Sequence, residues 1–85
     1  MHIAGVVVQV HPKHLAAAQG ELEVLAGVEV HAISPAGRCV VTIEGDHRHV
    51  VADMMSRVNA LPGVLSACMV YEQSESEFIN VEVSQ

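Results

Sequence analysis

The sequence predicts a small α+β domain with a four-stranded antiparallel sheet and two helices on one face. Two apolar, helix-like segments end in nearly the same four residues, Leu25-Ala26-Gly27-Val28 and Leu61-Pro62-Gly63-Val64. Each segment follows one β-branched run and precedes another, so a strand–helix–strand unit occurs twice. A chain of 85 residues is one small domain, and two such units fill it.

General rules of chain connection set the order of the strands. Each repeat needs a right-handed crossover, and a hairpin joins the second strand to the third. These conditions place the first and third strands in the centre and both helices on one face. The arrangement is the split strand–helix–strand, or ferredoxin-like, βαββαβ fold, and its second face is expected to be uncovered.

The first repeat is expected to form a strand at 3–10, a helix that ends near residue 25 and a strand at 28–33. Pro12 suits the first helical turn, because the N–H that it lacks would have no helical partner there. Gly27 is a common residue just after a helix end. Apolar side chains at helical spacing predict the buried stripe Leu15, Ala18, Leu22 and Leu25.

The second repeat follows the turn Ser34-Pro35-Ala36-Gly37, which is expected to close a hairpin. Strands are predicted at about 38–44 and 65–72, with a helix between them that Pro62-Gly63 ends. Asp46 is expected to cap this helix, because its carboxylate can accept a hydrogen bond from a free N–H of the first turn. The buried stripe is Val51, Met54, Met55, Val58 and Leu61.

Residues 1–73 are expected to form one domain, and residues 74–85 allow two interpretations. The segment around residues 73–77 is polar and acidic, which is typical of a loop or a frayed end. Apolar residues then alternate through 78–83, which is a strand pattern. These residues either add an edge strand to the sheet or belong to an acidic tail, and the sequence leaves both open.

Composition and charge exclude some classes of partner. The chain is 51% hydrophobic but has no Trp, one Tyr and one Phe, so Val, Ala, Leu and Ile must build the core. The net charge is −6, and only four Lys and Arg are scattered along the chain, which disfavours a nucleic-acid partner. An acidic surface favours a cationic partner instead.

Cysteine usage and the N-terminal sequence favour a soluble cytoplasmic protein. Cys39 and Cys68 are predicted on different strands with opposite orientations, which favours two free thiols in a reducing compartment. The start of the chain shows no cationic signal-peptide region, and its apolar run is too short to span a bilayer. No membrane insertion is expected, and the oligomeric state does not follow from the sequence.

Alternation along the strands predicts which side chains lie on the uncovered face. Val8 matches Val41 of the second repeat, so both are expected to face the helices and their neighbours to face away. In the fourth strand the bulky Met69 suits the core. The predicted outward side chains are Val7, Gln9, Glu29, His31, Val40, Thr42, Glu44, Cys68 and Val70. Their apolar content suggests a docking surface, unless the tail or a second subunit covers it.

The sequence offers no set of residues for catalysis, a metal or a cofactor. Six histidines occur, but no Cys-x-x-Cys or His-Glu-x-x-His pattern brings ligands together. No Ser-His-Asp arrangement and no glycine-rich phosphate loop can be identified. A binding module is therefore expected, not an enzyme, with no metal and no cofactor.

Several ordered segments carry a resemblance to a known family. They are Val6-Val7-Val8-Gln9, Val28-Glu29-Val30-His31-Ala32, Gly37-Arg38-Cys39-Val40-Val41-Thr42-Ile43-Glu44 and Leu61-Pro62-Gly63-Val64-Leu65-Ser66-Ala67-Cys68-Met69-Val70-Tyr71. In this order and spacing, over about residues 3 to 73, the chain resembles the NapD family. Two positions depart from the family pattern: Ala26 stands where proline is common, and Glu72 stands where histidine is frequent.

The resemblance implies a ferredoxin-like cytoplasmic chaperone for the catalytic subunit of periplasmic nitrate reductase. Such a chaperone binds the twin-arginine signal peptide of that subunit and delays export until the molybdenum cofactor is loaded. A peptide with a cationic start and an apolar middle would lie as an amphipathic helix on the uncovered face. Glu29, Glu44 and Glu72 would form an acidic rim that meets its arginines.

Two other classes of protein share this fold. Regulatory domains of the ACT-like kind bind amino acids between paired subunits, with help from a glycine-rich loop after the first strand. The residues at that place, His11-Pro12-Lys13, contain no glycine. A heavy-metal-binding domain of the same topology needs paired cysteines, which this chain lacks. The signal-peptide chaperone is therefore the favoured hypothesis, with the ACT-like domain as the alternative.

Overall fold

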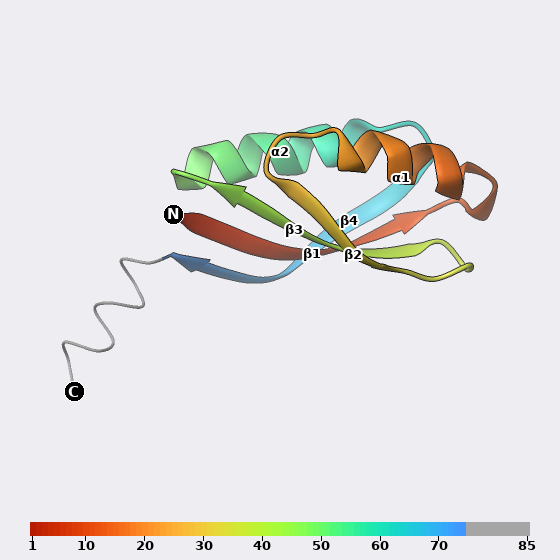
Figure 1. The fold of residues 1–85 in the computed structure, drawn as a ribbon, viewed down its shortest axis with the longest axis horizontal. Coiled ribbons are helices and arrows are strands. Elements are labelled where there is room, and N and C mark those ends of the chain that lie inside the picture. The colour runs from red at the N-terminus through yellow and green to blue at the C-terminus, as the bar shows by residue number, and fades with distance from the viewer. Residues whose placement is uncertain (75–85) are drawn as a thin grey trace.

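The computed structural model describes residues 1–74 as two layers, a sheet and a pair of helices (Figure 1). The elements are β1 (His2–Val10), η1 (Pro12–His14), α1 (Leu15–Glu23), β2 (Val28–Ile33), β3 (Arg38–Gly45), α2 (Arg48–Ala60) and β4 (Val64–Ser74). The strands form one antiparallel sheet in the order β2-β3-β1-β4, and both helices lie on one side of it. The predicted ferredoxin-like fold is confirmed. The strand alternative for residues 78–83 lies outside the described residues.

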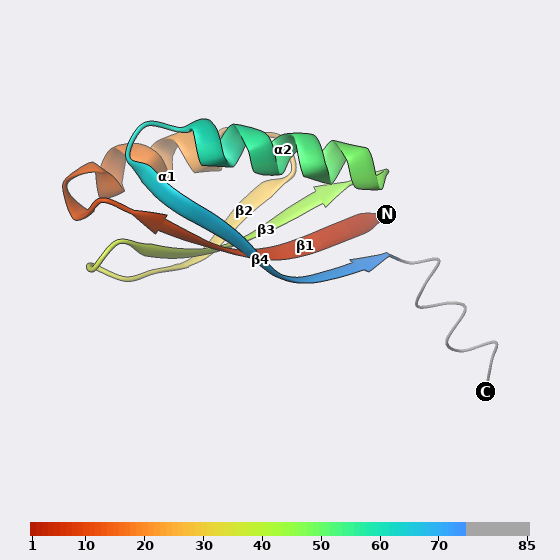
Figure 2. The same ribbon diagram turned by 180° about the vertical axis from the view of Figure 1, so that it is seen from behind.

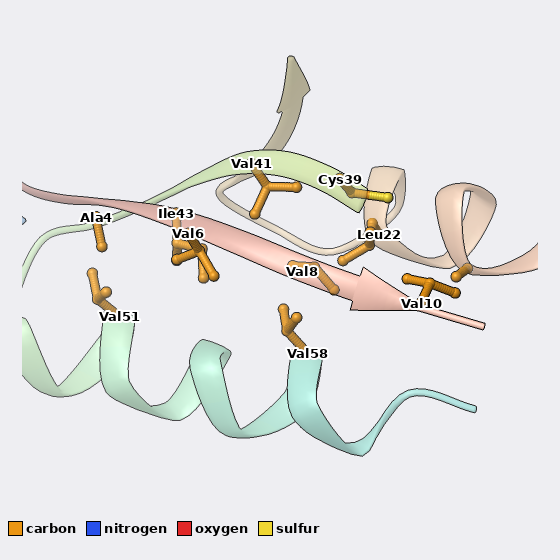
Figure 3. Packing of buried hydrophobic residues seen from close by; sticks show 11 residues of the cluster. Ala4, Val6, Val8, Val10, Leu22, Cys39, Val41, Ile43, Val51 and Val58 are labelled. Carbon is orange, nitrogen blue, oxygen red and sulfur yellow. The ribbon is translucent and has the colours of Figure 1, made fainter. Parts of the chain in front are cut away.

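The core fills the space between the sheet and the helices, and it consists mostly of valine. Its fully buried residues are Ala4, Val6, Val8, Val10, Ala18, Leu22, Cys39, Val41, Ile43, Val51 and Val58. Val51 of α2 points toward Ala4, and Val58 points toward Val8 (Figure 3). Both predicted helix stripes therefore face the sheet, with Leu15, Leu25, Met54 and Leu61 packed at the edges of the cluster.

The helical segment of each repeat is followed by the same backbone turn. Val28 N–H donates to the Leu25 carbonyl at 3.2 Å, and Val64 N–H donates to the Leu61 carbonyl at 3.1 Å. Gly27 and Gly63 occupy the third position of these turns with φ of 78° and 84°. A positive φ at this position defines a type II turn and favours glycine. The repeated sequence thus encodes a repeated turn that returns each helix to the sheet.

The helix ends differ from their predicted positions. α1 stops at Glu23, so Leu25 packs on the core from the following turn and not from the helix. α2 starts at Arg48, with His47 as its N-cap residue and no side-chain hydrogen bond to the cap. The prediction that Asp46 caps α2 is wrong, because Asp46 precedes the cap position by one residue. Chain boundaries of this kind commonly shift by one or two residues.

Both edge strands carry β-bulges, whereas β1 and β3 pair continuously over eight residues. In β2 an extra residue, His31, lies between the paired residues Val30 and Ala32. In β4 the pairing with β1 skips Leu65 and Val70. A bulge interrupts the two-residue alternation of a strand. The alternation predicted from sequence is therefore reliable in the centre of the sheet and fails locally at its edges.

Alanine substitutions at Gly20 and Gly27 should change the free energy of unfolding in opposite directions. A β-carbon at Gly20 would meet open space on helix α1, so Gly20→Ala should raise the free energy of unfolding by about 0.5–1 kcal/mol. Gly27 has a positive φ, and a β-carbon there would collide with the Glu44 carbonyl, so Gly27→Ala should lower it by at least about 1 kcal/mol. Urea denaturation of both variants measures the two effects. Equal effects of the two changes would contradict the turn assignment.

Candidate functional site

The sheet face that points away from α1 and α2, which we call the open face, has no described helix over it (Figure 2). Strand pairing assigns its members, because residues directly opposite each other in a sheet share a face. On β1 and β3 they are Ile3, Gly5, Val7, Gln9, Arg38, Val40, Thr42 and Glu44. On the edge strands they are Glu29, His31, Ala32, Ser66, Cys68, Tyr71 and Gln73.

A row of small apolar side chains crosses the middle of the open face. Val40 of β3 lies opposite Ala32 of β2 on one side and opposite Val7 of β1 on the other. Val7 in turn lies opposite Cys68 of β4. Val40 is 40% exposed, and Ala32 and Cys68 are exposed as well. The row therefore spans all four strands and is accessible to a partner. Val7, Val40 and Cys68 lie where the sequence predicted them.

Polar groups surround the β2–β3 side of this row. Thr42 lies opposite Glu29, and its hydroxyl is hydrogen-bonded to Nε2 of His31 at 2.8 Å. Glu44 lies further along β3, opposite Ile3, and its side chain is exposed. Two exposed carboxylates therefore lie next to Thr42: Glu29 across the β2–β3 pair and Glu44 two residues along β3. The structure confirms the outward orientation predicted for these four polar residues, and Gln9 also lies on this face, opposite Arg38.

A bulge in β4 lies at Val70, which the sequence predicted on the open face. Val70 is the extra residue of a bulge, so it has no partner in β1, although it is 60% exposed. Tyr71 takes the open-face position opposite Gly5, and a β-carbon at Gly5 would collide with the tyrosine ring. The ring thus lies against the Gly5 backbone. Simple alternation groups Tyr71 with the inward Met69, but a glycine inside a strand is a signal for such a close approach.

Glu72 was predicted in the acidic rim, but the structure places it on the helix side of the sheet. Glu72 pairs with the buried Ala4, because the bulge at Val70 has shifted the alternation by one residue. Its Oε1 atom lies 3.1 Å from Nε2 of His2 and 3.5 Å from a guanidinium nitrogen of Arg48. These contacts connect the start of α2 to the end of β4. Glu72 therefore does not belong to the open face.

The two thiols differ in accessibility, as predicted. Cys39 lies in the core, and burial raises the pKa of its thiol. Cys68 is exposed on the open face, and both cysteines are free. Since the thiolate is the reactive form, Cys68 is expected to react with thiol reagents in the folded protein and Cys39 is not.

A groove with a volume of about 500 Å³ runs along the free edge of β2. Gln19 and Glu23 of α1 form one wall, and residues 28–33 form the other. Glu29 and His31 belong both to this groove and to the open face. The groove therefore extends the acidic side of the open face around the edge of the sheet.

The described residues contain neither a metal-binding cluster nor a membrane-spanning helix. Among residues 1–74 no three His, Cys, Asp or Glu side chains are placed to hold one metal ion. None of the helices in this part of the chain combines the length and apolar character needed to cross a bilayer. The open face does supply apolar area, the two carboxylates Glu29 and Glu44, and the hydrogen-bonded pair His31 and Thr42.

Comparison with known proteins gives consistent matches. The chain is 27% identical over 77 residues to the chaperone NapD of Haemophilus influenzae, and the match covers 89% of this chain and 83% of that protein. It aligns with the solution structure of the E. coli Tat proofreading chaperone NapD with a TM-score of 0.78 and 25% identity, over 88% and 80% of the two chains. Both relatives are named as chaperones, which agrees with the prediction of a binding protein and not an enzyme.

A further similarity concerns the fold alone. An AsnC-family transcriptional regulatory protein of Pyrococcus furiosus aligns with a TM-score of 0.69 at 13% identity, over 84% of this chain and 49% of that protein. The family model described as NapD protein matches residues 1–76, which include every described strand and helix. The chain therefore belongs to the NapD family of chaperones, as the sequence resemblance predicted.

Proposed function

We propose that this protein binds the twin-arginine signal peptide of the catalytic subunit of periplasmic nitrate reductase and delays its export. Binding would take place in the cytoplasm, before the subunit has folded around its molybdenum cofactor. A signal peptide held on the chaperone cannot engage the export machinery at the same time. The similarity to the E. coli Tat proofreading chaperone supports this role.

One observation carries the proposal: an accessible apolar row with carboxylates on one side lies on a sheet face without a described helix. The row is Ala32, Val40, Val7 and Cys68, and the carboxylates are Glu29 and Glu44. A twin-arginine signal has a cationic start followed by an apolar segment. As an amphipathic helix it would offer an apolar stripe to the row and arginines to the carboxylates.

Apolar contacts and charge pairs differ in how much free energy they contribute to binding. Burial of one aliphatic side chain contributes about 1.5–3 kcal/mol, so a few apolar contacts supply most of the affinity. An exposed Arg–carboxylate pair contributes about 0.2–1 kcal/mol. Charge pairs of this strength favour one register and one orientation more than they raise affinity. The apolar row is therefore the part of the site whose loss should weaken binding most.

Amide chemical shifts of the ¹⁵N-labelled protein test the proposal directly. Titration with the synthetic signal peptide should shift the resonances of Val7, Val40 and Cys68, because the peptide covers them. Resonances on the outer surface of α2, such as that of Asn59, should stay unchanged. A leader of equal length without an arginine pair serves as the control. Unchanged strand resonances at peptide concentrations far above micromolar would refute the proposal.

A pair of neutral substitutions separates the open face from the rest of the surface. Val40→Asn removes an apolar contact without adding charge and should raise the dissociation constant of the signal peptide at least about tenfold, or about 1.4 kcal/mol. Val24→Asn makes the same change beyond the end of α1, where Val24 is 81% exposed, and should leave the constant unchanged. Isothermal titration calorimetry measures both, with thermal unfolding as the check on folding. Equal affinities of the two variants would exclude Val40 from the contact.

A further inference from the structure

Charged side chains divide between the two ends of the sheet. All carboxylates of residues 1–74 lie near the end where β1 starts and β3 ends, or in the helix halves nearest to that end (Figure 1). They are Glu21, Glu23, Glu29, Glu44, Asp46, Asp53 and Glu72. Lys13, Arg38 and Arg57 lie toward the opposite end, and Arg48 is the one Lys or Arg at the acidic end among those described. The folded domain therefore has a charge gradient along its strands.

The open face carries the same gradient. Along β3 its outward residues run from Arg38 through Val40 and Thr42 to Glu44. Glu29 of β2 adds a second carboxylate beside Thr42. The outward residues on β4 have no charge: they are Ser66, Cys68, Tyr71 and Gln73. Within the described residues, one corner of the face, formed by β2 and the end of β3, is thus the only part of it that can pair with arginines.

We infer that the signal peptide binds in a single orientation, with its arginine pair at Glu29 and Glu44 and its apolar segment running diagonally toward Cys68. This inference rests on the proposed function and adds the direction of the bound chain. The reverse orientation would place the arginines over uncharged β4. A peptide shifted along the strands would bring them to Arg38, where like charges repel.

The distances on the face fit a helix of ordinary length. Cys68 lies two strands away from Glu44 and four residues further along the strand direction. With strand spacings of about 4.8 Å and a rise of about 3.4 Å per residue, the diagonal is about 17 Å. A helix covers that distance in about eleven residues, because it rises about 1.5 Å per residue. Residues about ten or eleven positions after the arginine pair should therefore lie over Cys68.

The native thiol of Cys68 makes this orientation measurable. Signal peptides are prepared with one cysteine, activated as a mixed disulfide with thiopyridine, at successive positions after the arginine pair. The Cys68 thiolate attacks the peptide sulfur, forms the protein–peptide disulfide and releases thiopyridine as the leaving thiolate. The rate of cross-linking should be highest about ten or eleven residues after the arginines and at least about tenfold lower next to them. Cys68→Ser should abolish the product, because Cys39 is buried.

The outcomes separate this inference from the proposed function. Peptides that bind but cross-link fastest beside the arginines, or at the same rate from every position, would overturn the orientation and leave the function intact. Peptides that show no binding in calorimetry would refute the proposed function itself. A maximum about ten or eleven residues along the peptide supports both.

A double-mutant cycle tests the contact between the peptide arginines and the acidic corner, Glu29 and Glu44, without using a thiol. The double variant Glu29→Gln, Glu44→Gln should weaken binding of the signal peptide about tenfold, an effect that added salt reduces. Replacement of both peptide arginines by glutamine should weaken binding to the wild type by a similar factor, but should barely change binding to the double variant. The matched control is Asp46→Asn, Asp53→Asn, because both side chains are exposed and lie outside the open face and the groove. Additive effects of the protein and peptide changes would overturn the assigned contact.

Discussion

Successive side chains of β1 and β3 point to opposite faces of the sheet, and only one of the two sets is mainly apolar. On β1 the inward set is Ala4, Val6, Val8 and Val10, all fully buried, with the buried His2 at the start of the strand. A slip of one residue would bury Gln9, Thr42 and Glu44 instead, at a cost of about 2 kcal/mol or more for each unpaired polar group. The helices can therefore pack on one side only. The other face stays available because the pattern that folds the protein excludes it from the core.

This constraint also explains which features could be predicted from the sequence. The central strands β1 and β3 pair with each other without interruption, so alternation predicts their outward residues correctly. The duplicated turn with Gly27 and Gly63 fixes the topology. Val7, Val40, Cys68 and the two carboxylates Glu29 and Glu44 follow from these two patterns. Ala32 does not, because it reaches the open face only through the bulge at His31.

The features that sequence reasoning misses lie where local geometry breaks the pattern. The bulge at Val70 exchanges the faces of Tyr71 and Glu72, and no residue type marks a bulge in the sequence. Gly5 is the available signal, since its missing side chain makes room for the Tyr71 ring. His31 is also a bulge residue, but its bond to Thr42 keeps it on the predicted face. Alternation therefore predicts the face of His31 correctly, but it does not account for the bulge or for the hydrogen bond to Thr42.

The bulges bear on the kind of segment that the sheet can receive. An extended peptide would bind by adding a strand to an edge, and it would need a regular row of backbone partners. Bulges at His31 on β2 and at Leu65 and Val70 on β4 interrupt that row on both edges. A helix satisfies its backbone hydrogen bonds internally, so it needs only side-chain contacts with the sheet. The geometry of the edges and the composition of the open face therefore favour the same partner, a short amphipathic helix laid across the strands.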